Sequence, residues 1–81
     1  MFDTKKIVEI IEDVIEVEIN DYSVNLFNCG LDSLGVLKLI TFIEEELGIE
    51  IYDGDLTVEN MSSVKSILNL VKKYDVEQTR E

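Results

Sequence analysis

The stretch DSLGVLKLITFIEEELG, residues 32–48, decides the fold of this chain. Its apolar residues recur at the three- and four-residue spacing of one helix face. Asp-Ser suits the start of a helix, and glycine commonly follows a helix end. The stretch therefore predicts an amphipathic helix that opens at Asp32–Ser33 and ends at Leu47. Its expected buried side chains are Val36, Leu39, Ile40, Ile43 and Leu47, and those expected to face water or a partner are Lys38, Thr41, Glu44, Glu45 and Glu46.

A second amphipathic segment precedes this helix. Residues from about Thr4 to Val17 carry apolar side chains at helical spacing, which predicts another helix. Asp3 or Thr4 can cap its start. Between the two helices, residues 18–31 combine turn-forming residues with scattered apolar ones, so we expect a long loop pinned to the core.

The C-terminal part of the chain predicts one short helix and one long one. Residues 56–61 suffice for at most one or two helical turns. Ser62 or Ser63 then caps a helix whose apolar stripe extends to Tyr74. The last seven residues, 75–81, are polar, and we expect them to form a disordered tail.

Length and composition support one small folded domain, which we place at residues 1–74. The chain has 81 residues, of which 46% are hydrophobic, a fraction that argues against disorder. The predicted fold is all-α, a small four-helix bundle of three long helices and one short third helix. The initiating Met1 and the length favour a free-standing module over one excised from a larger synthase, although such a piece would look similar.

The charge of the chain restricts its partners. Eighteen acidic against seven basic residues give a net charge of −11. Nucleic acid and anionic membrane surfaces need clustered Lys and Arg, so both are excluded as partners, whereas a basic protein surface fits. No apolar run reaches transmembrane length, so we expect a cytoplasmic monomer without membrane insertion.

Several chemistries are excluded by composition. The chain has no histidine, which removes Ser-His-Asp triads, Cys-His pairs and histidine-ligated zinc. Its single cysteine, Cys29, allows no internal disulfide and weakly favours a reducing compartment. Polar residues between Asp21 and Asp32 have the spacing of ligands in an EF-hand calcium loop, but Leu26 occupies the position where that loop requires glycine. We therefore expect no metal site.

One short motif carries a candidate site. The sequence GLDSL at residues 30–34 places a hydroxyl, that of Ser33, at the first residue of the predicted helix, after a glycine that permits close backbone approach. A phosphate ester on Ser33 would lie at free backbone N–H groups and at the positive end of the helix dipole. The alternative is that Asp32 or Ser33 only caps the helix.

The surroundings of this motif favour the first interpretation. Residues 25–34 (NLFNCGLDSL) and 43–51 (IEEELGIEI) closely resemble the acyl and peptidyl carrier protein superfamily, and the resemblance extends from the first helix to Tyr74. It implies that Ser33 receives 4′-phosphopantetheine from coenzyme A through a Mg²⁺-dependent phosphopantetheinyl transferase. The thiol of that group would then carry an acyl or aminoacyl group as a thioester. By the same resemblance, Asp32 would help to position the transferase's metal and the coenzyme.

The resemblance also implies a non-catalytic carrier with several partners. These are the transferase, a loading enzyme (an adenylating ligase or an acyltransferase) and a downstream synthase or transferase with a basic docking surface. Glu44 and Glu45 are candidate docking residues, with an ordinary solvated face as the alternative. Lys38 lies on the same face, and Leu34 beside Ser33 can touch a partner or the phosphopantetheine arm. We assign Ser33, Asp32, Gly30 and Leu34 to the cofactor site.

The chain departs from the family pattern at several positions, and these departures favour a specialised carrier over the housekeeping carrier of fatty acid synthesis. Carriers of fatty acid synthesis commonly have acidic residues where this chain has Gly35 and Lys38, and proline where it has Tyr52. Asp-Ser-Leu-Gly is similar to the Asp-Ser-Met-Gly of D-alanyl carrier proteins, and the missing side chain of Gly35 is expected beside the arm. The Ile- and Val-rich stripes should also pack tightly and leave little space for a long chain.

We therefore expect an aminoacyl or short acyl cargo in an aminoacyl/peptidyl, polyketide or D-alanyl-type pathway. The alternatives are the housekeeping carrier of fatty acid synthesis and, from a different class, an unmodified acidic helical interaction domain with degenerate calcium loops.

Overall fold

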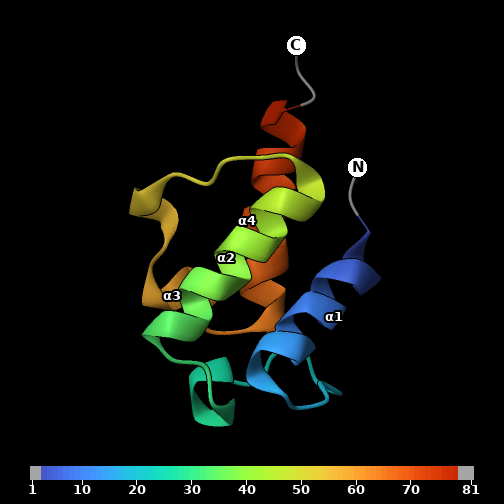
Figure 1. Cartoon of the computed structure of the whole chain (residues 1–81), viewed down its shortest axis with the longest axis vertical. Coiled ribbons are helices and arrows are strands. Elements are labelled where there is room, and N and C mark those ends of the chain that lie inside the picture. Colours follow the sequence, from blue (N-terminus) through green and yellow to red (C-terminus); the bar gives the residue numbers. More distant parts are fainter. Residues whose placement is uncertain (1–2, 79–81) are drawn as a thin grey trace.

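The computed structural model describes the backbone of residues 3–78 and the side chains of residues 3–74. Within them the chain is all-α, as predicted, with helices in contact around one apolar interior (Figure 1). Helices α1 and α2 pack against each other, α4 packs against α1, and the short α3 packs against α4. The helices are α1 (Thr4–Ile15), α2 (Ser33–Leu47), α3 (Val58–Met61) and α4 (Val64–Gln78), and two 3₁₀ turns lie at Leu26–Cys29 and Asp53–Asp55.

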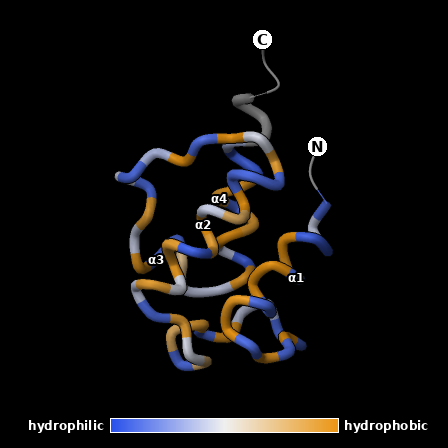
Figure 2. Tube along the Cα trace, in the orientation of Figure 1, coloured by the Kyte–Doolittle hydropathy of each residue, from blue (hydrophilic) through white to orange (hydrophobic). Residues whose placement is uncertain are grey.

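The core forms from the inward stripes of the three long helices and from loop residues between them. Figure 2 shows hydrophobic stretches along the helices. Burial of apolar side chains is the main stabilising contribution in a domain of this kind. The largest fully buried side chains are Ile7, Ile11, Leu26, Leu39, Ile43, Met61, Val64, Ile67 and Val71.

Helix α2 has the predicted ends. The Asp32 carboxylate caps its start by accepting a hydrogen bond from the Gly35 N–H at 2.8 Å. Its other end stops at Leu47 because Gly48 adopts a left-handed φ of 66°. The predicted stripe is confirmed at Leu39, Ile40 and Ile43, whereas Val36 and Leu47 are only partly buried.

Helix α1 ends two residues earlier than periodicity predicts. Asp3 caps its start, and its last residue is Ile15, because Glu16 adopts a left-handed φ of 59°. Helix α4 continues to Gln78, beyond the predicted end at Tyr74, so part of the segment expected as a tail is helical. Residues 79–81 of that expected tail lie outside the described residues.

The long loop between α1 and α2 is pinned to the core, as expected. Its residues Ile19, Leu26 and Leu31 are buried. Two backbone hydrogen bonds also tie it to the start of α4: Leu26 N–H donates to Ser62 O at 2.6 Å, and Lys65 N–H donates to Tyr22 O at 3.0 Å. The loop therefore holds the start of α2 against the rest of the domain.

Helices α1 and α2 end with the same arrangement. In each, a glutamate four residues before the left-handed residue accepts a hydrogen bond from the backbone N–H seven residues further on. Glu12 Oε2 accepts from Ile19 N at 2.8 Å, and Glu44 Oε2 accepts from Ile51 N at 2.8 Å. Each carboxylate thus holds the segment that follows the helix against the end of that helix.

None of the helices within residues 3–78 has the length and apolar character that crossing a bilayer requires.

Candidate functional site

Ser33 is the first residue of α2, and its side chain is exposed. The preceding turn produces this position. Gly30 has a φ of 107° at the end of the 3₁₀ turn, a conformation that side-chain-bearing residues rarely adopt, and its N–H donates to Leu26 O. Asp32 then caps α2, and its backbone oxygen accepts from Val36 N at 2.8 Å. Gly30, Asp32, Ser33 and Leu34 thus lie together at the start of one helix.

The Ser33 hydroxyl differs from the other serine hydroxyls of the chain. The remaining serines all use theirs in hydrogen bonds: Ser23 to Asp21, Ser62 to Glu59, and Ser63 and Ser66 to each other. Among the residues that the structure describes, Ser33 has no such bond. Its hydroxyl is therefore available to an external reagent.

An open groove of about 380 Å³ begins at Ser33 and extends between α2 and α3. Apolar side chains also surround the serine on the outside: Leu34 is 69% exposed, Leu37 59% and Val58 71%. Sequence patterns identified Leu34 but missed Leu37 and Val58, and Val58 comes beside α2 only in the folded chain. The lining residues of the groove are Phe27, Ser33, Val36, Leu37, Leu56, Thr57, Val58 and Met61.

Tyr52 and Asp55, in the segment that precedes α3, are hydrogen-bonded to Tyr74 of α4. The buried Tyr74 hydroxyl donates a hydrogen bond to Asp55 Oδ2 and accepts one from Tyr52 N at 3.0 Å. Lys73 Nζ lies 3.3 Å from the same carboxylate oxygen. The Tyr74 hydrogen bond holds the pKa of Asp55 below its usual value, and burial followed by that bond raises the pKa of Tyr74.

The candidate docking residues are not equivalent. Lys38 and Glu45 are exposed, whereas Glu44 is half-buried and its carboxylate holds the Ile51 N–H. The Glu44 carboxylate therefore has a structural role as well, and its part in docking stays a prediction.

Gly35 is closely surrounded by other residues. A Cβ at this position would lie 3.0 Å from Leu31 Cδ1 and 3.5 Å from Val14 Cγ1. A side chain here would therefore meet the loop, α1 and the Asp32 carboxylate next to Ser33, and the expectation that it would lie beside the arm stays a prediction. Glycine here allows close packing of α2 against the loop and α1.

The fold and the site together define a class of protein, a small helical carrier domain with an exposed serine at the start of a helix. Residues 5–71 match the family model described as "Phosphopantetheine attachment site". The chain is 41% identical over 73 residues to the acyl carrier protein of Buchnera aphidicola subsp. Baizongia pistaciae, which covers 86% of this chain and 91% of that protein. It is 30% identical over 76 residues to the acyl carrier protein of Clostridium acetobutylicum, which covers 90% of this chain and 96% of that protein. No solved structure gives a significant match.

The chain therefore belongs to the phosphopantetheine-attachment family, as a carrier protein related to acyl carrier proteins. The resemblance seen in the sequence is confirmed. Proteins of this family are non-catalytic carriers, and membership implies a phosphopantetheinyl transferase and acyl-handling enzymes as partners.

Proposed function

We propose that Ser33 is the residue to which phosphopantetheine is attached. The observation that carries this proposal is its exposed hydroxyl, which makes no hydrogen bond within the described residues although the other four serines do. A phosphodiester at the first residue of α2 would also lie at the positive end of a 15-residue helix. The surroundings thus fit the charge of the group.

Asp32 lies next to Ser33 and caps the start of α2. Its Oδ1 is used in the hydrogen bond with the Gly35 N–H, while the carboxylate as a whole remains exposed next to Ser33. We propose that its accessible oxygen helps to position the Mg²⁺ and the coenzyme of the transferase, since a carboxylate oxygen is a preferred ligand of that ion. Gly30 and Leu34 complete the site as the turn that exposes Ser33 and as an apolar contact beside it.

A modification reaction tests the assignment of Ser33. The protein is incubated with coenzyme A, Mg²⁺ and a broad-specificity phosphopantetheinyl transferase, and its intact mass is measured. We expect one added group on the wild type and none on Ser33→Ala. Ser23→Ala is the matched control, because Ser23 is also exposed but already bonded to Asp21. Modification of Ser33→Ala would overturn the assignment.

For cargo, we propose an aminoacyl or short acyl group in a specialised pathway. Support comes from the exposed Lys38 on α2 and from the groove beside Ser33, which lies at the surface rather than inside the bundle. A loading enzyme, either an adenylating ligase or an acyltransferase, would supply this group. A synthase or transferase that meets the exposed Leu34 beside Ser33 would consume it.

The second candidate is the carrier of fatty acid synthesis, which the names of the acyl carrier protein relatives favour. The two are distinguished by the mass of the thioester-linked species on protein isolated from its native cell. Aminoacyl or short acyl groups support the specialised pathway. A ladder of fatty acid elongation intermediates would contradict it.

A further inference from the structure

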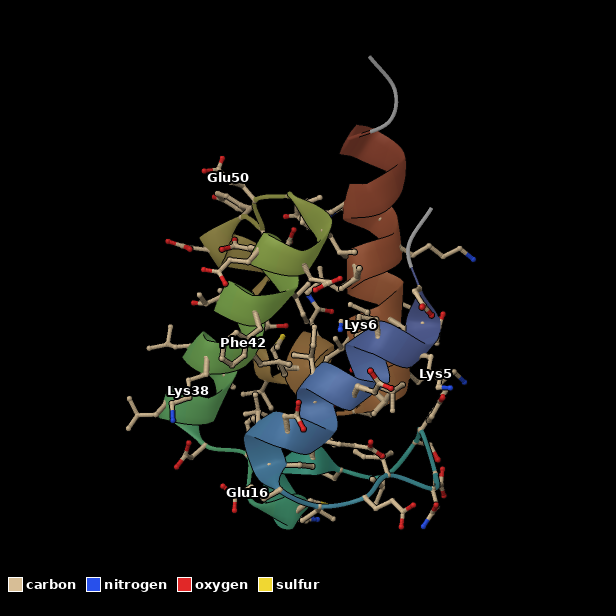
Figure 3. All side chains as sticks on the ribbon, turned by 45° about the vertical axis from the view of Figure 1, so that its right-hand side comes forward. Lys5, Lys6, Glu16, Lys38, Phe42 and Glu50 are labelled. Atoms are coloured by element: carbon tan, nitrogen blue, oxygen red, sulfur yellow. The ribbon has the colours of Figure 1, made fainter. Side chains whose placement is uncertain are left out.

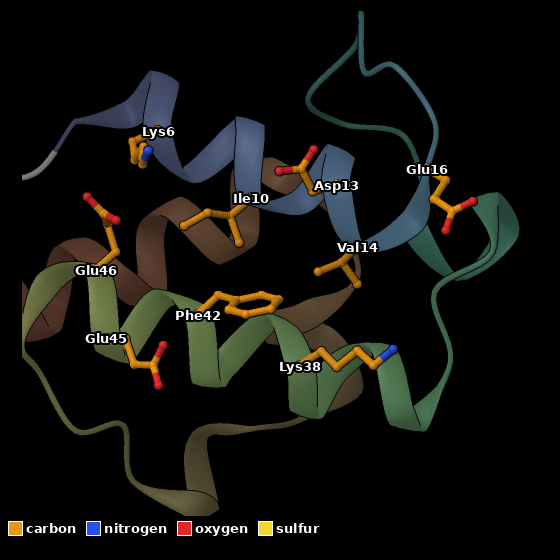
Figure 4. Close-up of a pocket in the computed structure, with 9 residues that line it drawn as sticks. All are labelled: Lys6, Ile10, Asp13, Val14, Glu16, Lys38, Phe42, Glu45 and Glu46. Atoms are coloured by element: carbon orange, nitrogen blue, oxygen red, sulfur yellow. The ribbon is translucent and has the colours of Figure 1, made fainter.

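A second groove lies between α1 and α2, and it is distinct from the one beside Ser33. It has a volume of about 670 Å³ and an apolar floor formed by Ile10, Val14 and Phe42 (Figure 4). Phe42 is 46% exposed although it lies well inside a 15-residue helix. A half-exposed aromatic ring in a hollow is the kind of surface that commonly receives an apolar side chain of another molecule.

This groove lies on the opposite side of α2 from Ser33. Phe42 follows Ser33 by nine residues, which is about two and a half turns of an α-helix. Figure 3 shows Lys38 and Phe42 near each other on α2, and Figure 4 shows the Phe42 ring between α2 and α1. A molecule bound in the α1–α2 groove therefore leaves the attachment site uncovered.

Charged side chains line both ends of the groove. Figure 4 shows Asp13 and Glu16 near the Lys38 end, and Glu45 and Glu46 near the Lys6 end. Among the described side chains, none of these six makes an ion pair or a hydrogen bond, in contrast to Glu12 and Glu44. Four carboxylates against two ammonium groups leave the groove negative by two charges.

The charge pattern identifies the occupant. With one excess negative charge at each end and an apolar centre, the groove is complementary to an apolar side chain that has a cationic residue on both sides. A second copy of this chain does not fit, because its net charge of −11 would be repelled. We propose that the α1–α2 groove is a second docking surface, which binds an apolar side chain of a partner protein between two Lys or Arg residues.

This proposal goes beyond the carrier function, because it concerns a surface that does not contain Ser33. A partner held there keeps the carrier nearby while the opposite side of α2 serves the enzymes that act on the arm. The groove would thus separate retention of the carrier from delivery of its cargo.

A peptide titration tests the proposal on the full chain. The probe is the blocked peptide Lys-Lys-Ala-Leu-Ala-Lys-Lys, and the control peptide replaces Leu with Ser. Binding is followed by amide NMR shifts at low ionic strength. We expect the Leu peptide to perturb residues around Ile10, Val14 and Phe42, and to bind at least fivefold more tightly than the Ser peptide. Equal binding of the two peptides, or shifts centred on Leu37 and Val58, would overturn the proposal.

Two variants locate the apolar contact. Phe42→Ala should weaken binding of the Leu peptide at least fivefold, whereas Val58→Ala, which truncates an exposed apolar side chain beside Ser33, should leave it unchanged. If the amide spectrum shows that Phe42→Ala is not folded, the double variant Asp13→Asn and Glu45→Gln takes its place. This variant removes one exposed carboxylate from each end and should also weaken binding at least fivefold. Unchanged affinity in the folded variant contradicts the proposal.

A last measurement separates this proposal from the carrier assignment. Ser33→Ala should bind the Leu peptide as the wild type does. Saturating peptide should change the rate of phosphopantetheine transfer to the wild type by less than twofold. A peptide that competes with the transferase would show that the two surfaces overlap and would overturn the proposal, while the assignment of Ser33 would stand.

Discussion

Glu44 and Glu45 are adjacent in the sequence but have different surroundings. Glu44 is half-buried and accepts the hydrogen bond from Ile51 N, whereas Glu45 is exposed on the wall of the α1–α2 groove. A carboxylate that satisfies a backbone N–H stabilises the fold, while an unpaired surface carboxylate mainly affects association with charged partners. Glu44 therefore holds the chain leaving α2, and Glu45 remains available for recognition.

The two glutamates should respond differently to truncation. Glu44→Ala should lower the free energy of unfolding by about 1 kcal/mol, because Ile51 N–H loses its partner. Glu45→Ala should change it by less than about 0.5 kcal/mol. Urea denaturation followed by circular dichroism measures both values. Equal effects of the two substitutions would contradict the structural role of Glu44.

The hydrogen bond between Tyr74 and Asp55 should appear in the pH dependence of stability. The pKa of Asp55 is lowered, first by the Tyr74 hydroxyl, so the unfolded chain binds more protons than the folded chain between the two pKa values. The stabilisation is thus present above the ordinary pKa of about 4 and is lost as the pH falls through the folded value.

Thermal unfolding from pH 7 to pH 2 measures this effect. Asp55→Asn is the comparison, because it lacks the titrating group while the other acidic residues still titrate. The advantage of the wild type over Asp55→Asn should shrink below about pH 4. A constant difference between the two melting temperatures over this range would show that the carboxylate is not stabilised in the fold.

Helices α1 and α2 share one type of C-terminal structure but use different residues at its key position. Gly48 adopts the left-handed conformation after α2, and Glu16 adopts it after α1. A side chain with a Cβ is disfavoured there by about 1 kcal/mol, whereas glycine is not. The end of α1 therefore carries a local strain that the end of α2 lacks.

Glu16→Gly should relieve this strain. We expect it to raise the free energy of unfolding by about 0.5–1 kcal/mol, after allowance for the greater freedom of glycine in the unfolded chain. Glu16→Ala removes the same carboxylate but keeps the Cβ, so it should show none of this gain. Chemical denaturation of both variants separates the backbone effect from the loss of charge.

Periodicity and capping residues predicted the helices well. The prediction was best for α2, because local sequence signals mark its apolar stripe, its N-terminal cap and the glycine after its C-terminus. The left-handed conformation of Glu16 could not be predicted, since no glycine marks that position. Ser33 was identified as the candidate attachment residue because its motif is local. Leu56, Thr57 and Val58 were missed as lining residues, because their place beside Ser33 depends on packing between distant segments.

The excess of acidic residues affects the whole domain. A net charge of −11 is confined to a body of about 38 × 24 × 19 Å. The Debye length is about 30 Å at 0.01 M salt and about 8 Å at 0.15 M. At low salt every carboxylate is therefore repelled by most of the others, and at physiological salt only by its neighbours.

Salt should consequently stabilise this protein. Raising NaCl from 10 to 200 mM should increase Tm by roughly 4–8 °C, the shift that corresponds to about 1 kcal/mol in a domain of this size. The same change should weaken binding of the Leu peptide, because that association uses opposite charges. Circular dichroism melts measure the first effect, and a Tm that falls with salt would show that attraction between charges outweighs repulsion.

The hydrogen bond from Leu26 N to Ser62 O determines how the groove beside the attachment site can change its width. Leu26 precedes Phe27, which forms one part of the groove, and Ser62 directly follows α3, which forms another. This hydrogen bond therefore links the two parts to each other. The remaining wall is α2, and Ser33 lies on it. We expect a cargo that needs more room to displace α2 rather than to separate the two linked parts, and this displacement would also shift Ser33, the proposed anchor point of the arm.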